Sequence, residues 1–237
     1  ETNIFSGVVG TFGGAIYNNG SVLTVNNGSV FTSNEAQQGG AIYVSGNKNV
    51  NINGTFGGET DATGDKGNKA ELRGAIYITG GNNVTVAGLF SNNVATTNGG
   101  AIYADSSFSI VANNSETVFT GNTANALSNA IYVNASTSVT IRMNATNNGT
   151  IRFDDAIQGA NKYNIAINGD NYDDKVIFNN LIQNANISID NITVAINAAG
   201  LDLTPFGVES ILDNSVVTLN SGVLELNTVT VDAWTTK

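Results

Sequence analysis

The chain of 237 residues contains no cysteine and no histidine, and it has one proline, one methionine and one tryptophan. Without cysteine there is no disulfide framework, no thiolate chemistry and no thiolate-ligated zinc site. Without histidine there is no Ser-His triad and no imidazole acid–base catalysis. Enzyme classes that depend on these side chains are therefore excluded, and we expect no cofactor.

Charge is also scarce, and most of it is negative. Nine Lys and Arg residues stand against 19 Asp and Glu residues, which gives a net charge of −10 and a pI of about 4.2. Nucleic acids and anionic membranes bind clustered Lys and Arg, so both are poor partners for this chain. No run of 18 apolar residues predicts a transmembrane helix. Because neither end resembles a natural terminus, we expect a segment of a longer protein.

What is present is a repeat rich in asparagine and glycine, with 38 and 27 copies of these residues. The pentapeptide Gly-Gly-Ala-Ile-Tyr begins at Gly13, Gly39 and Gly99, and variants begin at Arg73 and Ser128. Its copies are 26 to 34 residues apart. A period of this size indicates a solenoid, a propeller or an array.

A second motif, Phe-x-x-Asn, runs out of phase with the first. It begins at Phe31, Phe90 and Phe119, and Phe56 holds the equivalent place without the asparagine. Between the motifs, three short strands and three Asn/Gly turns fit into one 26-residue period. Propeller blades need longer strands and a period of about 40–50 residues, and a sandwich would not repeat one motif per period.

The period therefore predicts an all-β parallel β-helix with about 20–30 residues per rung. Equivalent residues of successive rungs should then stack at about 4.8 Å. Strand alternation should turn the Ile ladder inward and the Tyr ladder outward or to a corner. The expected inward ladders are Ile16, Ile42, Ile76, Ile102 and Ile131, and Phe31, Phe56, Phe90 and Phe119; the outward ladder is Tyr17, Tyr43, Tyr77, Tyr103 and Tyr132.

We interpret residues 1–237 as one solenoid segment. Residues 12–140 carry the repeated motifs, whereas residues 141–237 continue with divergent rungs of the same alternating strand pattern. The long interval between the second and third pentapeptides contains a polar insertion near residues 57–72, which we expect to leave the stack as a loop. A harmless excursion is the simpler interpretation of this loop, but its charged side chains are candidate binding residues: Glu59, Asp61, Asp65, Lys66, Lys69 and Glu71.

The alternation of Gly-Gly-Ala-Ile and Phe-x-x-Asn over residues 13–134 resembles the passenger domains of polymorphic outer-membrane proteins and related bacterial autotransporters. Residues 149–182 are also similar to autotransporter passenger sequence. The resemblance implies a right-handed β-helix, display on the bacterial cell surface, and an outer-membrane β-barrel continuous with the passenger in the intact protein. It implies an adhesin that binds a host-cell surface protein or glycan, or another bacterial cell. The aromatic stripe is a second candidate contact, with corner packing as its alternative role.

Two other functions stay open. Parallel β-helices also carry polysaccharide lyases and glycosidases, which need grouped carboxylates. The acidic doublets Asp154-Asp155 and Asp173-Asp174 make Asp154 with Asp174 a conceivable pair, supported by Arg152 and Lys175. We nevertheless interpret the doublets as turn residues and predict no catalytic residue and no metal site. The third possibility is a passive stalk that presents a distal functional region.

Overall fold

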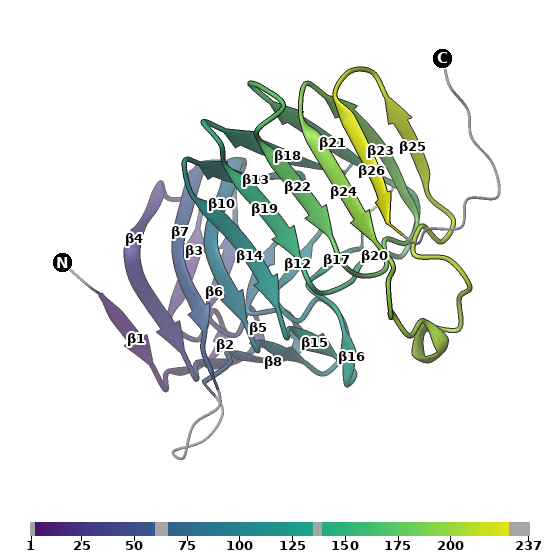
Figure 1. Cartoon of the computed structure of the whole chain (residues 1–237). Coiled ribbons are helices and arrows are strands. Elements are labelled where there is room, and N and C mark those ends of the chain that lie inside the picture. The colour runs from purple at the N-terminus through teal and green to yellow at the C-terminus, as the bar shows by residue number, and fades with distance from the viewer. Residues whose placement is uncertain (1–2, 60–65, 135–138, 228–237) are drawn as a thin grey trace.

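The structure, a computed structural model, describes residues 3–59, 66–134 and 139–227. Its strands wind into a parallel β-helix in which β1 and β26 lie at opposite ends (Figure 1). Every strand pair of the described ranges is parallel except β15 with β16. Within these ranges no helix is long and apolar enough to cross a membrane. The predicted β-helix fold is therefore confirmed.

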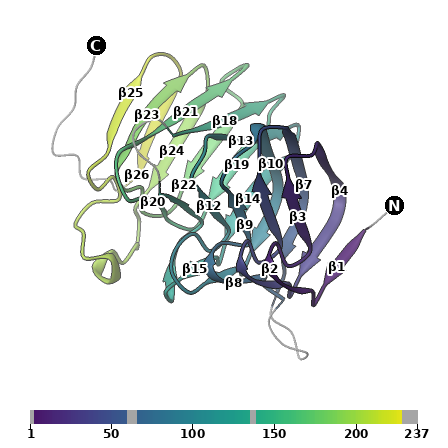
Figure 2. The same ribbon diagram turned by 180° about the vertical axis from the view of Figure 1, so that it is seen from behind.

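The strands form three sheets, and Figure 2 shows the smaller two from behind. Sheet A consists of β1 (Ile4–Ser6), β4 (Leu23–Thr32), β7 (Asn49–Gly57), β10 (Asn82–Ser91), β13 (Phe108–Asn113), β14 (Glu116–Thr120), β18 (Thr140–Thr146), β19 (Thr150–Phe153), β21 (Tyr163–Gly169), β22 (Lys175–Phe178), β23 (Ala185–Asp190), β24 (Thr193–Asn197), β25 (Val216–Leu219) and β26 (Val223–Asn227). Sheet B consists of β2 (Val9–Phe12), β5 (Glu35–Gln38), β8 (Lys69–Arg73), β11 (Val94–Ala95), β15 (Thr123–Ala124) and β16 (Leu127–Ser128). Sheet C consists of β3 (Ile16–Asn19), β6 (Ile42–Ser45), β9 (Ile76–Ile78), β12 (Ile102–Ala104), β17 (Ile131–Val133) and β20 (Ile157–Gly159).

The register of sheet C aligns the pentapeptides, so that isoleucine pairs with isoleucine and tyrosine with tyrosine from β3 to β17. The isoleucines point into the core, where all but the half-buried Ile16 are fully buried. In sheet A, Phe5, Phe31, Phe56, Phe90, Phe119, Phe153 and Phe178 stack face to face, with ring centroids 4.6–5.5 Å apart. The rung spacing imposes this geometry, because each ring repeats on the next strand.

The glycines of the pentapeptide form a tight corner between sheets B and C. At Gly100 an added Cβ would lie 2.6 Å from the backbone N and O of Thr123 and 2.8 Å from the carbonyl oxygen of Asn129. The preceding Gly99 has a φ of +66°, which side-chain-bearing residues rarely adopt. The corner thus requires glycine at position 100 because the backbone of the next rung lies close, and at position 99 because φ is positive.

The rungs become smaller toward the C-terminal end. Sheet B ends at β16, and after β19 a short turn at residues 154–156 leads directly to β20, the last strand of sheet C. After β22 the chain continues the sheet C position only through the isolated bridge of Ile182 with Ile157. Sheet A has by then divided, because β10 pairs with β13 through its first half and with β14 through its second. The placement of the sequence boundary at residue 140 remains a prediction.

In the described part of the chain, long connections follow β24 and β7. Between β24 and β25 the chain forms a long connection that contains the 3-10 helix η1 (Thr204–Phe206), with Pro205 in its first turn. The insertion after β7 is shorter than the expected range 57–72. Lys69 to Arg73 form β8, which pairs with β5 and β11, so Lys69 and Glu71 are strand residues rather than loop residues.

Candidate functional site

A ladder of buried asparagine side chains follows the Phe ladder along the turn from sheet A to sheet B. The amide nitrogen of each residue donates to the side-chain oxygen of the next, and the four bonds measure 2.8–2.9 Å. The backbone N–H of each donor residue donates to the same oxygen, which fixes the direction of the ladder. The ladder comprises Asn34, Asn68, Asn93, Asn122 and Asp155.

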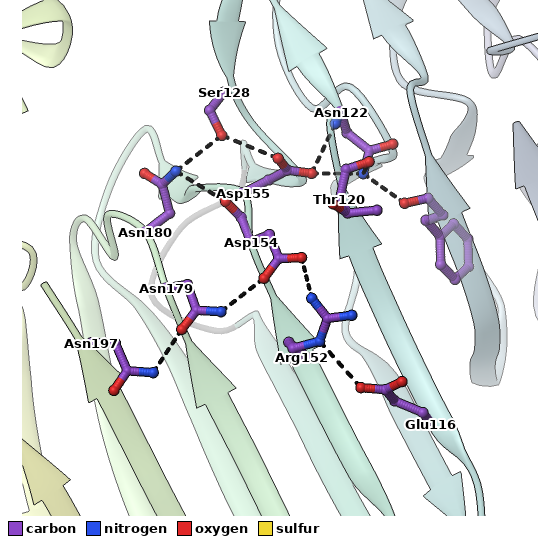
Figure 3. Close-up of polar contacts among 11 residues, drawn as sticks. Glu116, Thr120, Asn122, Ser128, Arg152, Asp154, Asp155, Asn179, Asn180 and Asn197 are labelled. Carbon is purple, nitrogen blue, oxygen red and sulfur yellow. Dashed lines mark hydrogen bonds and ion pairs between the residues drawn. The ribbon is translucent and has the colours of Figure 1, made fainter. Parts of the chain in front are cut away.

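The ladder ends on a carboxylate, which accepts hydrogen bonds but donates none when ionised. Asp155 accepts from both nitrogens of Asn122 at 2.8 Å and from the hydroxyl of Ser128 at 3.3 Å (Figure 3). Burial raises the pKa of Asp155, and the bonds from Asn122 and Ser128 oppose that shift. Asp155 is thus a structural terminus of the ladder.

A second amide ladder lies on the outer side of sheet A and has the opposite direction. Asn227 donates to Asn197, Asn197 donates to Asn179, and Asn179 donates to Asp154 at 2.8 Å. The two ladders therefore converge on the adjacent carboxylates Asp154 and Asp155, as Figure 3 shows for the residues nearest the junction. Because both ladders need an acceptor at this point, an acidic doublet satisfies both at once.

Arg152 neutralises the outer side of this junction. Its guanidinium pairs with Asp154 and, at 3.1 Å, with Glu116 on the neighbouring strand (Figure 3). Burial lowers the pKa of Arg152, but the hydrogen bonds that Arg152 donates to Asp154 and Glu116 outweigh it and raise the pKa overall. All charged groups of this network are satisfied by one another, which is typical of a structural ion pair.

The second acidic doublet has one buried and one exposed member. Asp174 is fully buried and accepts from the backbone N–H groups of Asp170, Asn171 and Gly149 at 2.9–3.2 Å. Burial alone would raise its pKa, but the hydrogen bonds from Asp170, Asn171 and Gly149 lower it overall. Asp173 is exposed. Asp174 therefore closes a turn and ties it to the preceding rung.

The structure does not bring the conceivable catalytic pair together. In the parallel register of β19 with β22, Phe153 aligns with Phe178 and Thr150 with Lys175. Asp154 thus follows one end of these strands, whereas Asp174 precedes the other end. Five residues of strand span about 16 Å, which exceeds the roughly 5–9.5 Å between glycosidase carboxylates. In the described residues no three Asp or Glu side chains form a metal-binding group.

The structure describes only some of the candidate loop residues. Asp61 and Asp65 lie outside the described residues. Glu59 and Lys66 flank the excursion, and its ends are close, because a Cβ added at Gly58 would lie 3.1 Å from the Cβ of Lys66. The structure thus leaves the contact role of this loop as a prediction.

The tyrosines of sheet C form a ladder at the corner next to sheet B, but its middle members are covered. Tyr17 is 54% exposed, whereas Tyr77 and Tyr103 are 3% and 6% exposed. The guanidinium of Arg73 lies 4.6 and 5.1 Å from their ring centroids, and the Tyr77 hydroxyl donates to Asp105 at 2.5 Å. Burial raises the pKa of both hydroxyls to about 12, with Asp105 adding to the shift.

The stripe is therefore not a continuous exposed aromatic surface. The two middle pairs of rings meet edge to face, with Tyr43 and Tyr77 at 5.1 Å and Tyr77 and Tyr103 at 5.5 Å. Edge-to-face contacts and a guanidinium over the ring stabilise packing. This arrangement favours corner packing for Tyr77 and Tyr103 and leaves Tyr17 as the accessible member.

Sequence reasoning missed two ladder residues. Asn68 takes the asparagine position of the Phe56 rung, but the insertion separates it from Phe56. Asp155 takes the same position after Phe153 with a different side chain. The spacing from Phe153 to Asp155 differs from Phe-x-x-Asn by one residue, and only the hydrogen bond to Asn122 identifies it.

The comparison with known families identifies the repeat. Residues 28–45 and 88–105 each match the family model of the Chlamydia polymorphic membrane protein (Chlamydia_PMP) repeat. No curated protein and no solved structure is significantly similar to the chain. Each matched stretch starts in sheet A, passes the buried asparagine, a strand of sheet B and the glycine corner, and ends in sheet C. The family repeat therefore covers the sheet B part of a rung together with its two adjoining corners. The chain therefore carries two copies of the Chlamydia polymorphic membrane protein repeat.

Proposed function

We propose that the chain is part of a passenger displayed on the bacterial surface, where it acts as an adhesin for a protein or glycan of a host cell or a neighbouring cell. The observation that carries this proposal is the coincidence of the family repeat with the β-helix rungs. In the intact protein the passenger is continuous with an outer-membrane β-barrel.

The physical properties of the solenoid suit such display. Successive rungs are joined by parallel ladders, by the stacked Phe rings and by the buried asparagine ladder, so the segment resists bending. Turns and excursions leave the stack without disturbing it, and they offer variable surface for contact. A rod of this kind projects a binding surface away from the membrane.

The experiment is a binding assay with the purified chain, labelled at its C-terminal end, on cultured animal cells and on bacterial cells. The proposal predicts saturable binding that excess unlabelled chain displaces. The same assay is repeated with a loop variant, in which a two-residue Gly-Ser turn replaces residues 59–66. The proximity of Gly58 and Lys66 permits this replacement. This variant keeps Asn68 and β8, whereas deletion through residue 71 would also remove a ladder residue and part of a strand.

Binding lost with the loop, while the circular dichroism spectrum stays unchanged, would place the contact in the loop. Binding that survives would keep the adhesin and assign the contact to another face of the solenoid. Absence of saturable binding to either cell type would refute the adhesin proposal for this segment and would support a passive stalk.

A further inference from the structure

A polar groove lies at the corner where the chain enters sheet A, between the starts of β7, β10 and β13. Its volume is about 500 Å³. In the register, Tyr77 aligns with Tyr103, and Thr85 with Ser109. Residues 78–83 make the turn from Tyr77 to Val84, whereas the shorter segment 104–107 joins Tyr103 to Phe108. The corner before β13 is thus two residues shorter than the corner before β10, and the groove lies beside these two corners.

The wall contributed by β10 is irregular. The pairing of β10 with β7 shifts register between Asn82 and Val84, and Asn83 has a φ of +50°. This bulge places the side chains of Asn82 and Asn83 in solvent at the edge of the groove. Each amide offers donors and an acceptor, which is the combination that adjacent hydroxyl groups require.

Arg142 forms the opposite wall. It lies on β18, beside Ser109 in the register, and its neighbours Ile141 and Met143 point into the core, so its own side chain is exposed on the outer face. Arg73 pairs with Asp105, and Arg152 pairs with Glu116 and Asp154. Among the described residues, the Arg142 guanidinium has no ion pair or hydrogen bond with any other group. An unpaired guanidinium in a chain with a net charge of −10 is available for a ligand anion.

We propose that this groove binds a saccharide that carries a carboxylate, an inference that deepens the proposed adhesin function and rests on it. The guanidinium pairs with the carboxylate through two parallel N–H donors. The amides of Asn82 and Asn83 and the hydroxyl of Ser109 bind the sugar hydroxyls. The groove offers a peptide little anchorage, because its apolar lining residues Val84 and Phe108 are buried. The net charge disfavours densely sulfated polyanions.

The test is a ligand-observed NMR titration of the purified chain with two probes, 3′-sialyllactose and a glucuronic-acid-containing disaccharide. Lactose is the matched neutral control. The proposal predicts saturable binding of at least one acidic probe, no comparable binding of lactose, and weaker binding at higher salt. The two probes distinguish a sialic acid from a uronic acid as the source of the carboxylate.

Variants identify the site. Loss of one charge-assisted bidentate contact lowers affinity about tenfold or more, so Arg142→Gln should bind the acidic probe at least about tenfold more weakly. Asn83→Gly, which suits the positive φ, should also weaken binding. Lys175→Gln removes an equal charge from an exposed position on β22 and should leave the affinity unchanged. Circular dichroism verifies that each variant is folded.

The possible results separate the two proposals. No binding of either acidic probe, or binding that Arg142→Gln leaves unchanged, would overturn the saccharide site. If cells still bind the Arg142→Gln variant as tightly as the native chain, the adhesin proposal survives and the groove assignment fails. If the acidic probe binds but cells do not, the groove assignment survives and the adhesin proposal fails.

Discussion

The direction of the buried asparagine ladder leads to an unequal response to two opposite substitutions. Asn93 donates to Asn122 at 2.8 Å and to the carbonyl oxygen of Phe56 at 2.9 Å, and it is fully buried. The variant Asn93→Asp replaces this donor by an acceptor with almost no change of shape. Two buried acceptors then lose the side-chain donor and face a carboxylate oxygen, although the Asn122 oxygen keeps the backbone N–H of Asn93. The reverse change, Asp155→Asn, occurs where only acceptance from Asn122 is needed.

The magnitude for Asn93→Asp follows from the lost bonds. The Phe56 carbonyl oxygen loses the amide donor, and the Asn122 oxygen keeps only the backbone N–H of Asn93 while it faces a carboxylate oxygen. At about 1–3 kcal/mol for each lost bond, the two together cost about 4 kcal/mol. A protonated side chain in the Asn93→Asp variant would restore one donor. Keeping a carboxyl with an ordinary pKa of about 4 protonated at pH 7 costs about 4 kcal/mol, so protonation brings no gain. With a urea m-value of about 2–3 kcal/mol per molar, the unfolding midpoint should fall by about 1.3–2 M.

Asp155→Asn should change the free energy of unfolding by less than about 1 kcal/mol. The new amide can accept from Asn122 through its oxygen and donate to the Ser128 hydroxyl, and it removes a desolvated charge. The assay is urea unfolding followed by circular dichroism at pH 7, with Asn186→Asp at an exposed position as control. Equal destabilisation by Asn93→Asp and Asp155→Asn would refute the assigned direction of the ladder.

Three further substitutions test other parts of the solenoid. Gly100→Ala should destabilise the chain by at least about 2 kcal/mol, because its Cβ would lie 2.6 Å from Thr123 backbone atoms; a urea midpoint equal to that of the native chain would contradict the corner geometry. Phe90→Ala should lower the free energy of unfolding by about 3–5 kcal/mol, because the Phe90 ring is buried between those of Phe56 and Phe119. Phe12 is 42% exposed, so the control Phe12→Ala should cost clearly less. Thermal unfolding that ranks the two variants in reverse would contradict the stacked core. The lowered pKa of Asp174 means that its stabilisation is present above about pH 4, its unfolded value, and is lost as the pH falls through the folded value. Asp174→Asn should therefore reduce stability at pH 7 and flatten its acid dependence, and an unchanged acid limb in urea unfolding would argue against this role.

The fold was predictable because the same residues recur once per rung. The Gly-Gly-Ala-Ile-Tyr and Phe-x-x-Asn spacings are short-range patterns, and stacking at the strand spacing follows from them directly. Positions that depend on contacts between rungs were less accessible. The asparagine of the Phe56 rung lies beyond an insertion, at Asn68, and the end of the ladder lies at a carboxylate, Asp155.

The surface was harder to predict than the core. Alternation along β9 and β12 sends Tyr77 and Tyr103 away from the isoleucines, but it does not show that Arg73 covers both rings. The Arg73 position belongs to a variant pentapeptide, so the motif alone gave no signal of this contact. The groove beside Arg142 lies at two corner turns of unequal length, which only the register of the strands makes visible.

The most direct test of the account is saturable binding of the purified chain to cells, measured by displacement of the labelled chain with excess unlabelled chain. If the segment is an adhesin, a saturable, displaceable component is expected on at least one cell type. The groove assignment also predicts that Arg142→Gln reduces this component while Lys175→Gln does not. Binding that neither saturates nor responds to unlabelled chain on any cell type would contradict the claim that this β-helix segment is an adhesin.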